Sequence, residues 1–175
     1  TDAKSGYYIN AELTPFIDIF SGDYGARMFA DARAYRSFGA DEKLTLAART
    51  QAGTVLGGDL NNTPADYLFY SGGGGSVRGQ PYNSLGVTRT SGGETYQTGG
   101  LSYVGAQLEA RYSVTDKIGV VGFYDFGQVG ADAGFGGETQ WHAGAGIGVR
   151  YNTGIGPIRL DIGTPASGDN IAKSV

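Results

Sequence analysis

The chain has 175 residues, a formal charge of −4 and no cysteine, so it fits one domain or one part of a larger one. The absence of cysteine excludes disulfides, thiolate zinc sites and a cysteine nucleophile, and the acidic balance argues against nucleic acid as a partner. The 32 glycines, 12 tyrosines and 8 phenylalanines favour strands and tight turns over helices.

Three runs of alternating residues come first in the chain, at residues 6–20, 27–38 and 44–55. Each run is about ten residues or longer, which is enough for a strand to cross a bilayer at a tilt. Pro15 lies within the first run, so we expect that strand to be bent, bulged or at a sheet edge.

A glycine-rich segment, "YLFYSGGGGSVRGQPYNSLG" at residues 67–86, follows these runs and places Gly72, Gly73, Gly74 and Gly75 ahead of Arg78. A phosphate-binding loop needs a lysine after its glycines and then a helix, and the pattern here provides neither. A slack glycine linker is an alternative, although aromatic residues flank the glycines on both sides. Because glycine has no side chain, such a segment can also pass through a confined space.

Four more alternating runs complete the pattern, at residues 103–114, 118–129, 141–151 and 157–164. The run "YVGAQLEARYSV" puts Val104 and Leu108 on one face and Glu109 and Arg111 on the other, and the next run places Asp125 among aromatic residues. Short connections at 21–25, 115–117 and 153–156 contrast with longer ones at 57–68, 80–101 and 130–140. In membrane barrels, short turns connect the strands on one side of the membrane and longer loops connect them on the other.

The polar face of these strands carries arginines with acidic residues, many glycines and large tyrosines, whereas lysine occurs only at positions 4, 43, 117 and 173, in expected turns or termini. A crowded, wet lumen in which guanidinium groups bridge carboxylates has this composition. We therefore predict an all-β fold, an antiparallel transmembrane β-barrel segment of about seven strands. A soluble β-sandwich or barrel is the alternative.

Four aromatic residues near strand ends suit an interfacial girdle: Tyr103, Tyr112, Trp141 and Tyr151.

The string "GGGGSVRG" resembles the [V/I]-R-G-[F/Y] motif of the outer-membrane insertase and transporter superfamily, which includes BamA, TamA and the two-partner secretion transporters. With "LEARYSVTDKIGVVGFYDFGQV" and "AGAGIGVRYNTGIGPIRLDIGTP" it is most similar to the TamA branch, over residues 67–165. The resemblance implies that residues 1–175 are the carboxy-terminal part of a larger, 16-stranded barrel. A long loop over about residues 68–101 would fold into the lumen. The chain stops at "GDNIAKSV", so we expect the closing strand to be lacking.

In this superfamily the motif arginine lies inside the lumen and engages acidic residues on the next two strands; the matching positions are Arg78, Glu109 and Asp125. Alternation independently assigns both acids to the polar face. The implied role is structural and gating, because these pairs would hold the loop inside the barrel. The alternative is that Glu109 and Asp125 pair with Arg111 and Arg150 along the lumen wall.

Val77 and Gly79 complete the motif around Arg78, but Gln80 stands where the superfamily usually has Phe or Tyr. Tyr82 is the candidate to take over the packing of that missing aromatic ring. His142 is the single histidine, and with no second histidine or any cysteine near it we expect an ordinary lumen or surface residue and no metal site.

The function implied by the resemblance is insertion or translocation of other outer-membrane proteins, autotransporters among them, in the outer membrane of a Gram-negative bacterium. It would need no cofactor and no enzymatic chemistry. The implied partners are outer-membrane lipid, unfolded client proteins and an inner-membrane-anchored TamB-like protein reached through domains outside this chain. One alternative is a two-partner secretion pore. Another is a passive structural or soluble β-domain without a client, in which Arg78 would be dispensable.

Overall fold

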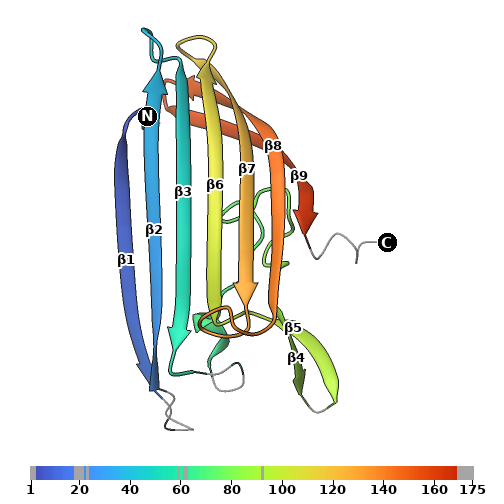
Figure 1. Ribbon diagram of the computed structural model, residues 1–175. Coiled ribbons are helices and arrows are strands. Elements are labelled where there is room, and N and C mark those ends of the chain that lie inside the picture. The colour runs from blue at the N-terminus through green and yellow to red at the C-terminus, as the bar shows by residue number, and fades with distance from the viewer. Residues whose placement is uncertain are drawn as a thin grey trace.

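A computed structural model describes residues 3–17, 22, 24–58, 60, 63–91 and 93–168. Seven long strands stand side by side in one antiparallel sheet, in the order β1-β2-β3-β6-β7-β8-β9 (Figure 1). Their bounds are β1 Gly6–Ile17, β2 Tyr24–Phe38, β3 Leu44–Leu56, β6 Ser102–Ser113, β7 Ile118–Gly130, β8 Thr139–Thr153 and β9 Gly156–Gly168.

All seven predicted strands are present, and the predicted all-β, antiparallel fold is confirmed. β1 forms an edge of this sheet, which is a position where a strand tolerates Pro15. β9 runs beyond its predicted end, and its register shifts where Gly144 pairs with Pro165 while Ala143 pairs with Ser167. One extra residue on β9 makes this bulge next to a proline, which lacks the N–H that a regular ladder needs. Two predictions fall outside the described residues. They are the end of the first predicted strand, at residues 18–20, and the lack of a closing strand, which depends on residues 169–175.

Alternation gives the sheet two chemically different faces. On one face large apolar side chains are exposed, as for Ile147 at 70%. On the other face charged side chains are covered, including Asp31, Asp125 and Arg150. A soluble fold would bury the apolar face, so this is the inside-out arrangement of a membrane barrel wall, and we call the two faces outer and inner. No helix among the described residues is long and apolar enough to span a membrane.

The two ends of the sheet carry connections of different length. Turns of a few residues join β2 to β3, β6 to β7 and β8 to β9 at the upper end of Figure 1, while residues 57–101 and 131–138 connect strands at the lower end. We call these the short-turn end and the long-loop end. In outer-membrane barrels short turns face the periplasm, so the short-turn end is the periplasmic side.

The connection between β3 and β6 contains structure that the sequence pattern did not predict. It has a 3₁₀ helix, Ala65–Tyr67, and a hairpin of β4 (Val87–Ser91) and β5 (Glu94–Thr98). The hairpin extends beyond the long-loop end of the sheet in Figure 1, whereas we expected all of residues 68–101 inside the lumen. Its mostly exposed side chains explain this position, because a polar hairpin is better solvated outside.

A hydrophobic cluster fills the inner face at the long-loop end and consists of Val55, Leu68, Phe69, Leu85, Val87, Leu101, Tyr103 and Val129. Tyr103 is only 4% exposed and stacks on Phe69 with ring centroids 6.0 Å apart. Its assignment to the interfacial girdle is therefore wrong, because odd positions of β6 face inward. Tyr112, Trp141 and Tyr151 are exposed on the outer face, as a girdle requires.

Candidate functional site

The glycine-rich segment folds back on itself beside the inner face of the sheet. Ser71 pairs with Leu85 as an isolated bridge, and the Gly73 amide donates to the Gln80 carbonyl at 3.0 Å. Gly72 and Gly73 have φ values of +116° and +88°, a region that side-chain-bearing residues rarely adopt. This turn places Arg78 at the inner face, and we call residues 71–85 the lumen loop.

Arg78 is bound by carboxylates of two adjacent strands, at the two positions that the superfamily resemblance matched to it. Its backbone amide, Nε and Nη2 donate to Asp125 on β7 at 3.0, 2.7 and 2.9 Å. Its Nη1 donates to Glu109 on β6 at 2.7 Å. The guanidinium also lies over the Phe123 ring, 3.7 Å from the centroid. Side-chain exposure is 15% for Arg78 and 0% for Asp125, so these charges depend on one another for stabilisation.

The charged network extends from this group toward β9. The second oxygen of Glu109 accepts a hydrogen bond from Arg111 at 2.5 Å and lies 3.9 Å from Arg150. Arg150 in turn pairs with Asp161, which is also 3.5 Å from Arg78. Glu109 therefore serves both the loop arginine and the wall arginine Arg111, whereas Arg78 alone binds Asp125 among the described residues. We call Arg78, Glu109 and Asp125 the Arg78 cluster.

Close contact between backbones fixes the lumen loop against the last strands. A Cβ atom added at Gly79, whose φ is +89°, would lie 2.7 Å from the backbone of Thr164 on β9. A Cβ atom at Gly144 on β8 would overlap the Arg78 carbonyl oxygen. In contrast, Gly74 and Gly75 face open space, so confinement explains only part of the four-glycine run.

A family model described as the Omp85 superfamily domain matches residues 1–172. The chain belongs to the Omp85 superfamily. This membership places it in the outer membrane of Gram-negative bacteria. The fold also matches the crystal structure of BamA from Haemophilus ducreyi lacking POTRA domains 1–3, with a TM-score of 0.76 at 20% identity, over 93% of this chain. The chain spans 35% of that structure, so it corresponds to part of such a barrel protein.

Gln80 stands where the superfamily motif has Phe or Tyr, and we predicted that Tyr82 would pack in place of that ring. The structure shows a different arrangement. Tyr82 does not replace the missing aromatic ring, because its side chain is 82% exposed. Gln80 is itself buried, and its amide nitrogen donates to the Ala143 carbonyl at 2.9 Å, next to the bulge between β8 and β9. In this Omp85 chain a hydrogen bond thus stands where ring packing was expected.

A Gln80→Ala variant should lose about 1 kcal/mol of unfolding free energy, because a buried carbonyl would lose its donor. Urea titration of the full-length protein in detergent, followed by circular dichroism, measures this loss. Tyr82→Ala provides the matched control and should change stability by less than about 0.5 kcal/mol, as for other exposed sites. A larger effect at Tyr82 than at Gln80 would contradict this account of the motif.

A second anchor, which the sequence analysis missed, holds the tip of the lumen loop. Arg49 on β3 donates to Asp31 on β2 at 2.6 Å and to the Gly75 carbonyl at 3.2 Å. Gln107 on β6 donates to the Ser76 carbonyl at 2.6 Å. The acceptors in the loop are backbone carbonyls, which carry no side-chain signature.

His142 also contacts the lumen loop. It is fully buried, and its Nε2 lies 2.9 Å from Ser71 Oγ. The histidine therefore contributes packing and one hydrogen bond to the loop.

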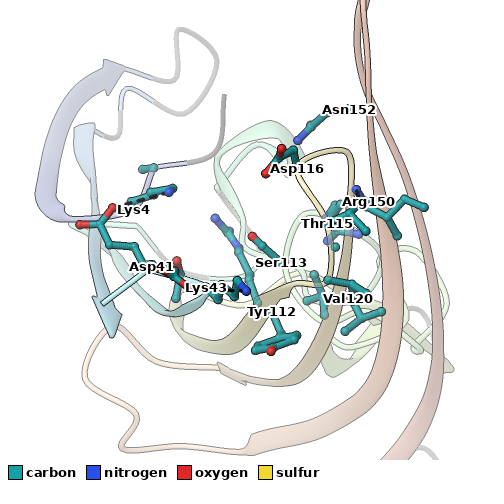
Figure 2. Close-up of a pocket in the computed structure, with 18 residues that line it drawn as sticks. Lys4, Asp41, Lys43, Tyr112, Ser113, Thr115, Asp116, Val120, Arg150 and Asn152 are labelled. Atoms are coloured by element: carbon teal, nitrogen blue, oxygen red, sulfur yellow. Dashed lines mark hydrogen bonds and ion pairs between the residues drawn. The ribbon is translucent and has the colours of Figure 1, made fainter. Parts of the chain in front are cut away.

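Two cavities open on the inner face. A cavity of about 710 Å³ lies at the short-turn end, and Figure 2 shows Lys4, Asp41 and Lys43 across from Arg150 and Asn152 around it. A second cavity, of about 300 Å³, borders the Arg78 cluster and has six arginines in its lining: Arg33, Arg49, Arg78, Arg111, Arg150 and Arg159. Arg111 and Arg150 line both cavities, so the charged network can be approached from the periplasmic side.

Proposed function

We propose that this chain is the loop-bearing, carboxy-terminal part of an Omp85 factor that inserts or translocates client proteins at the outer membrane, such as autotransporters. In this proposal the Arg78 cluster keeps the lumen loop docked during client assembly. The observation that carries the proposal is the set of four hydrogen bonds from Arg78 to Asp125 and Glu109. A passive barrel wall would not require a buried cation whose carboxylate partners lie on two different strands.

The docked loop connects strands that are distant in the sheet. It leaves the end of β3, binds β6 and β7 through Glu109 and Asp125, and contacts β8 and β9 at Gly144 and Thr164. Docking therefore stiffens the sheet from β6 to β9, the side that ends at the β9 edge. An exposed sheet edge can pair with an incoming strand, and a stiff wall would present that edge in a constant geometry. Unfolded barrel proteins are the partners that such an edge would take, without ATP or a cofactor. A TamB-like protein would engage domains outside this chain.

An Arg78→Ala variant of the full-length protein tests this proposal. We expect it to reach the membrane at a normal level but to lose most client assembly, measured as autotransporter display at the cell surface. Arg33→Ala is the matched control, since it removes a half-exposed lumen arginine that contacts Asp31 but not the lumen loop. Export of a soluble partner, assayed in parallel, reports on the alternative of a two-partner secretion pore. Unchanged assembly in the Arg78→Ala strain would favour a passive domain.

A further inference from the structure

Arg36 is the one charged residue on the outer face of the described strands. It alternates with Ala34 and Phe38 on β2 and pairs with Leu46 on β3, all of which share that face. The side chain is exposed, and its guanidinium lies 5.4 Å from the centroid of the Phe38 ring. None of the ion pairs formed among the described residues involves Arg36. The protein therefore presents an uncompensated cation on a surface that faces lipid.

An apolar groove of about 840 Å³ is lined in part by Arg36 and crosses the outer face from β1 to β7. Small residues form its floor, and a Cβ atom added at Gly122 would meet no heavy atom within 4 Å. Larger apolar side chains border it: Tyr7, Phe38, Leu46, Leu108 and Tyr124. β2, β3, β6 and β7 are each paired on both sides, so closure of a barrel would leave this groove on its lipid-facing surface.

The depth of Arg36 indicates which lipid atoms it meets. It lies two residues from the end of β2 at the short-turn end, which corresponds to about 7 Å along a strand. That position is at the headgroup level of the inner leaflet, because short turns face the periplasm. An arginine on a lipid-facing strand is poorly tolerated near the bilayer centre but can reach phosphate at the interface. Its planar guanidinium binds phosphate oxygens through paired hydrogen bonds.

We propose that Arg36 and this groove form a binding site for an anionic phospholipid of the inner leaflet. The lipid phosphate would bind the guanidinium, and an acyl chain would lie in the groove over Gly122. The combination makes the site selective for lipid charge as well as for an apolar chain. This inference concerns lipid binding alone and does not depend on whether the protein assembles clients.

Native mass spectrometry of the full-length protein, released from micelles with phosphatidylglycerol or phosphatidylcholine, tests the site. We expect preferential retention of phosphatidylglycerol, and about a fivefold loss of that preference in Arg36→Gln, as for removal of one surface cation. Lys43→Gln removes an exposed cation at the same end of the sheet and should leave the preference unchanged. Equal retention of both lipids by the unmodified protein, or equal losses in the two variants, would overturn the proposal.

Gly122→Ile separates the groove from the charge, since a Cβ atom at this position meets no heavy atom within 4 Å and the larger side chain would fill part of the groove. It should lower retention of both lipids. Ala32→Ile places the same side chain at an exposed position of the outer face that does not line the groove, and it should have no effect. Retention that is unchanged by Gly122→Ile would overturn the acyl-chain part of the site. Circular dichroism of each variant establishes that the barrel is folded.

Discussion

An Asp125→Ala variant of the full-length protein should lose about 3–5 kcal/mol of unfolding free energy, the range for removing one partner of a buried ion pair. Asp125 is fully buried and accepts three hydrogen bonds from Arg78, so its removal leaves a largely buried guanidinium with Glu109 as its main partner. The lumen loop should then leave the inner face. Trypsin cleaves after arginine, so faster cutting between Arg78 and Gly79 measures this release directly.

Asp161→Ala is the matched control for Asp125→Ala. Both carboxylates approach the same guanidinium, but Asp161 is 27% exposed and lies 3.5 Å from Arg78. Asp161 also pairs with the buried Arg150, so this variant should lose stability too, but cleavage after Arg78 should be no faster than in the unmodified protein. Equally fast cleavage in the two variants would show that Asp125 does not hold the loop.

A Gly79→Ala variant should destabilise the docked loop by about 1–3 kcal/mol from the left-handed backbone alone. The contact with Thr164 adds to this, because a Cβ atom at Gly79 would lie 2.7 Å from backbone that belongs to a paired strand and cannot easily move. Urea titration gives the change in unfolding free energy, and trypsin cleavage after Arg78 shows whether the loop has left β9.

Gly74→Ala tests whether this loss comes from the close contact or from stiffening of a flexible segment. It lies in the same glycine run but faces open space, so its stability should stay within about 0.5 kcal/mol of the unmodified protein. A comparable loss at both positions would show that chain flexibility, rather than contact with β9, is what the glycines provide.

The strands and their faces were predictable because alternation repeats over eight or more residues in each run. The same alternation put Glu109 and Asp125 on the inner face, and the superfamily resemblance matched them with Arg78. Neither source indicated Asp161 as a third carboxylate near Arg78, because its position depends on the register between β8 and β9. That register changes at the bulge beside Pro165, a feature of pairing that no single run contains.

The interior of the long connection was the least predictable part of the fold. The hairpin of β4 and β5 has only five residues in each strand and mostly polar side chains, so it gives little periodic signal. Tyr103 was misassigned because aromatic residues near strand ends occur both in girdles and in cores. Its odd position on β6 places it on the inner face, so alternation along the strand predicts its orientation better than residue type does.

The hydrophobic cluster beneath the lumen loop has an electrical consequence. Leu85, Val87 and Val129 are fully buried at the long-loop end, whereas the cavities toward the periplasm are lined by charged side chains. An ion entering from the periplasm would find favourable partners until it reached this apolar layer. In planar-bilayer recordings the docked loop should therefore keep conductance low, and undocking it should appear as discrete current steps.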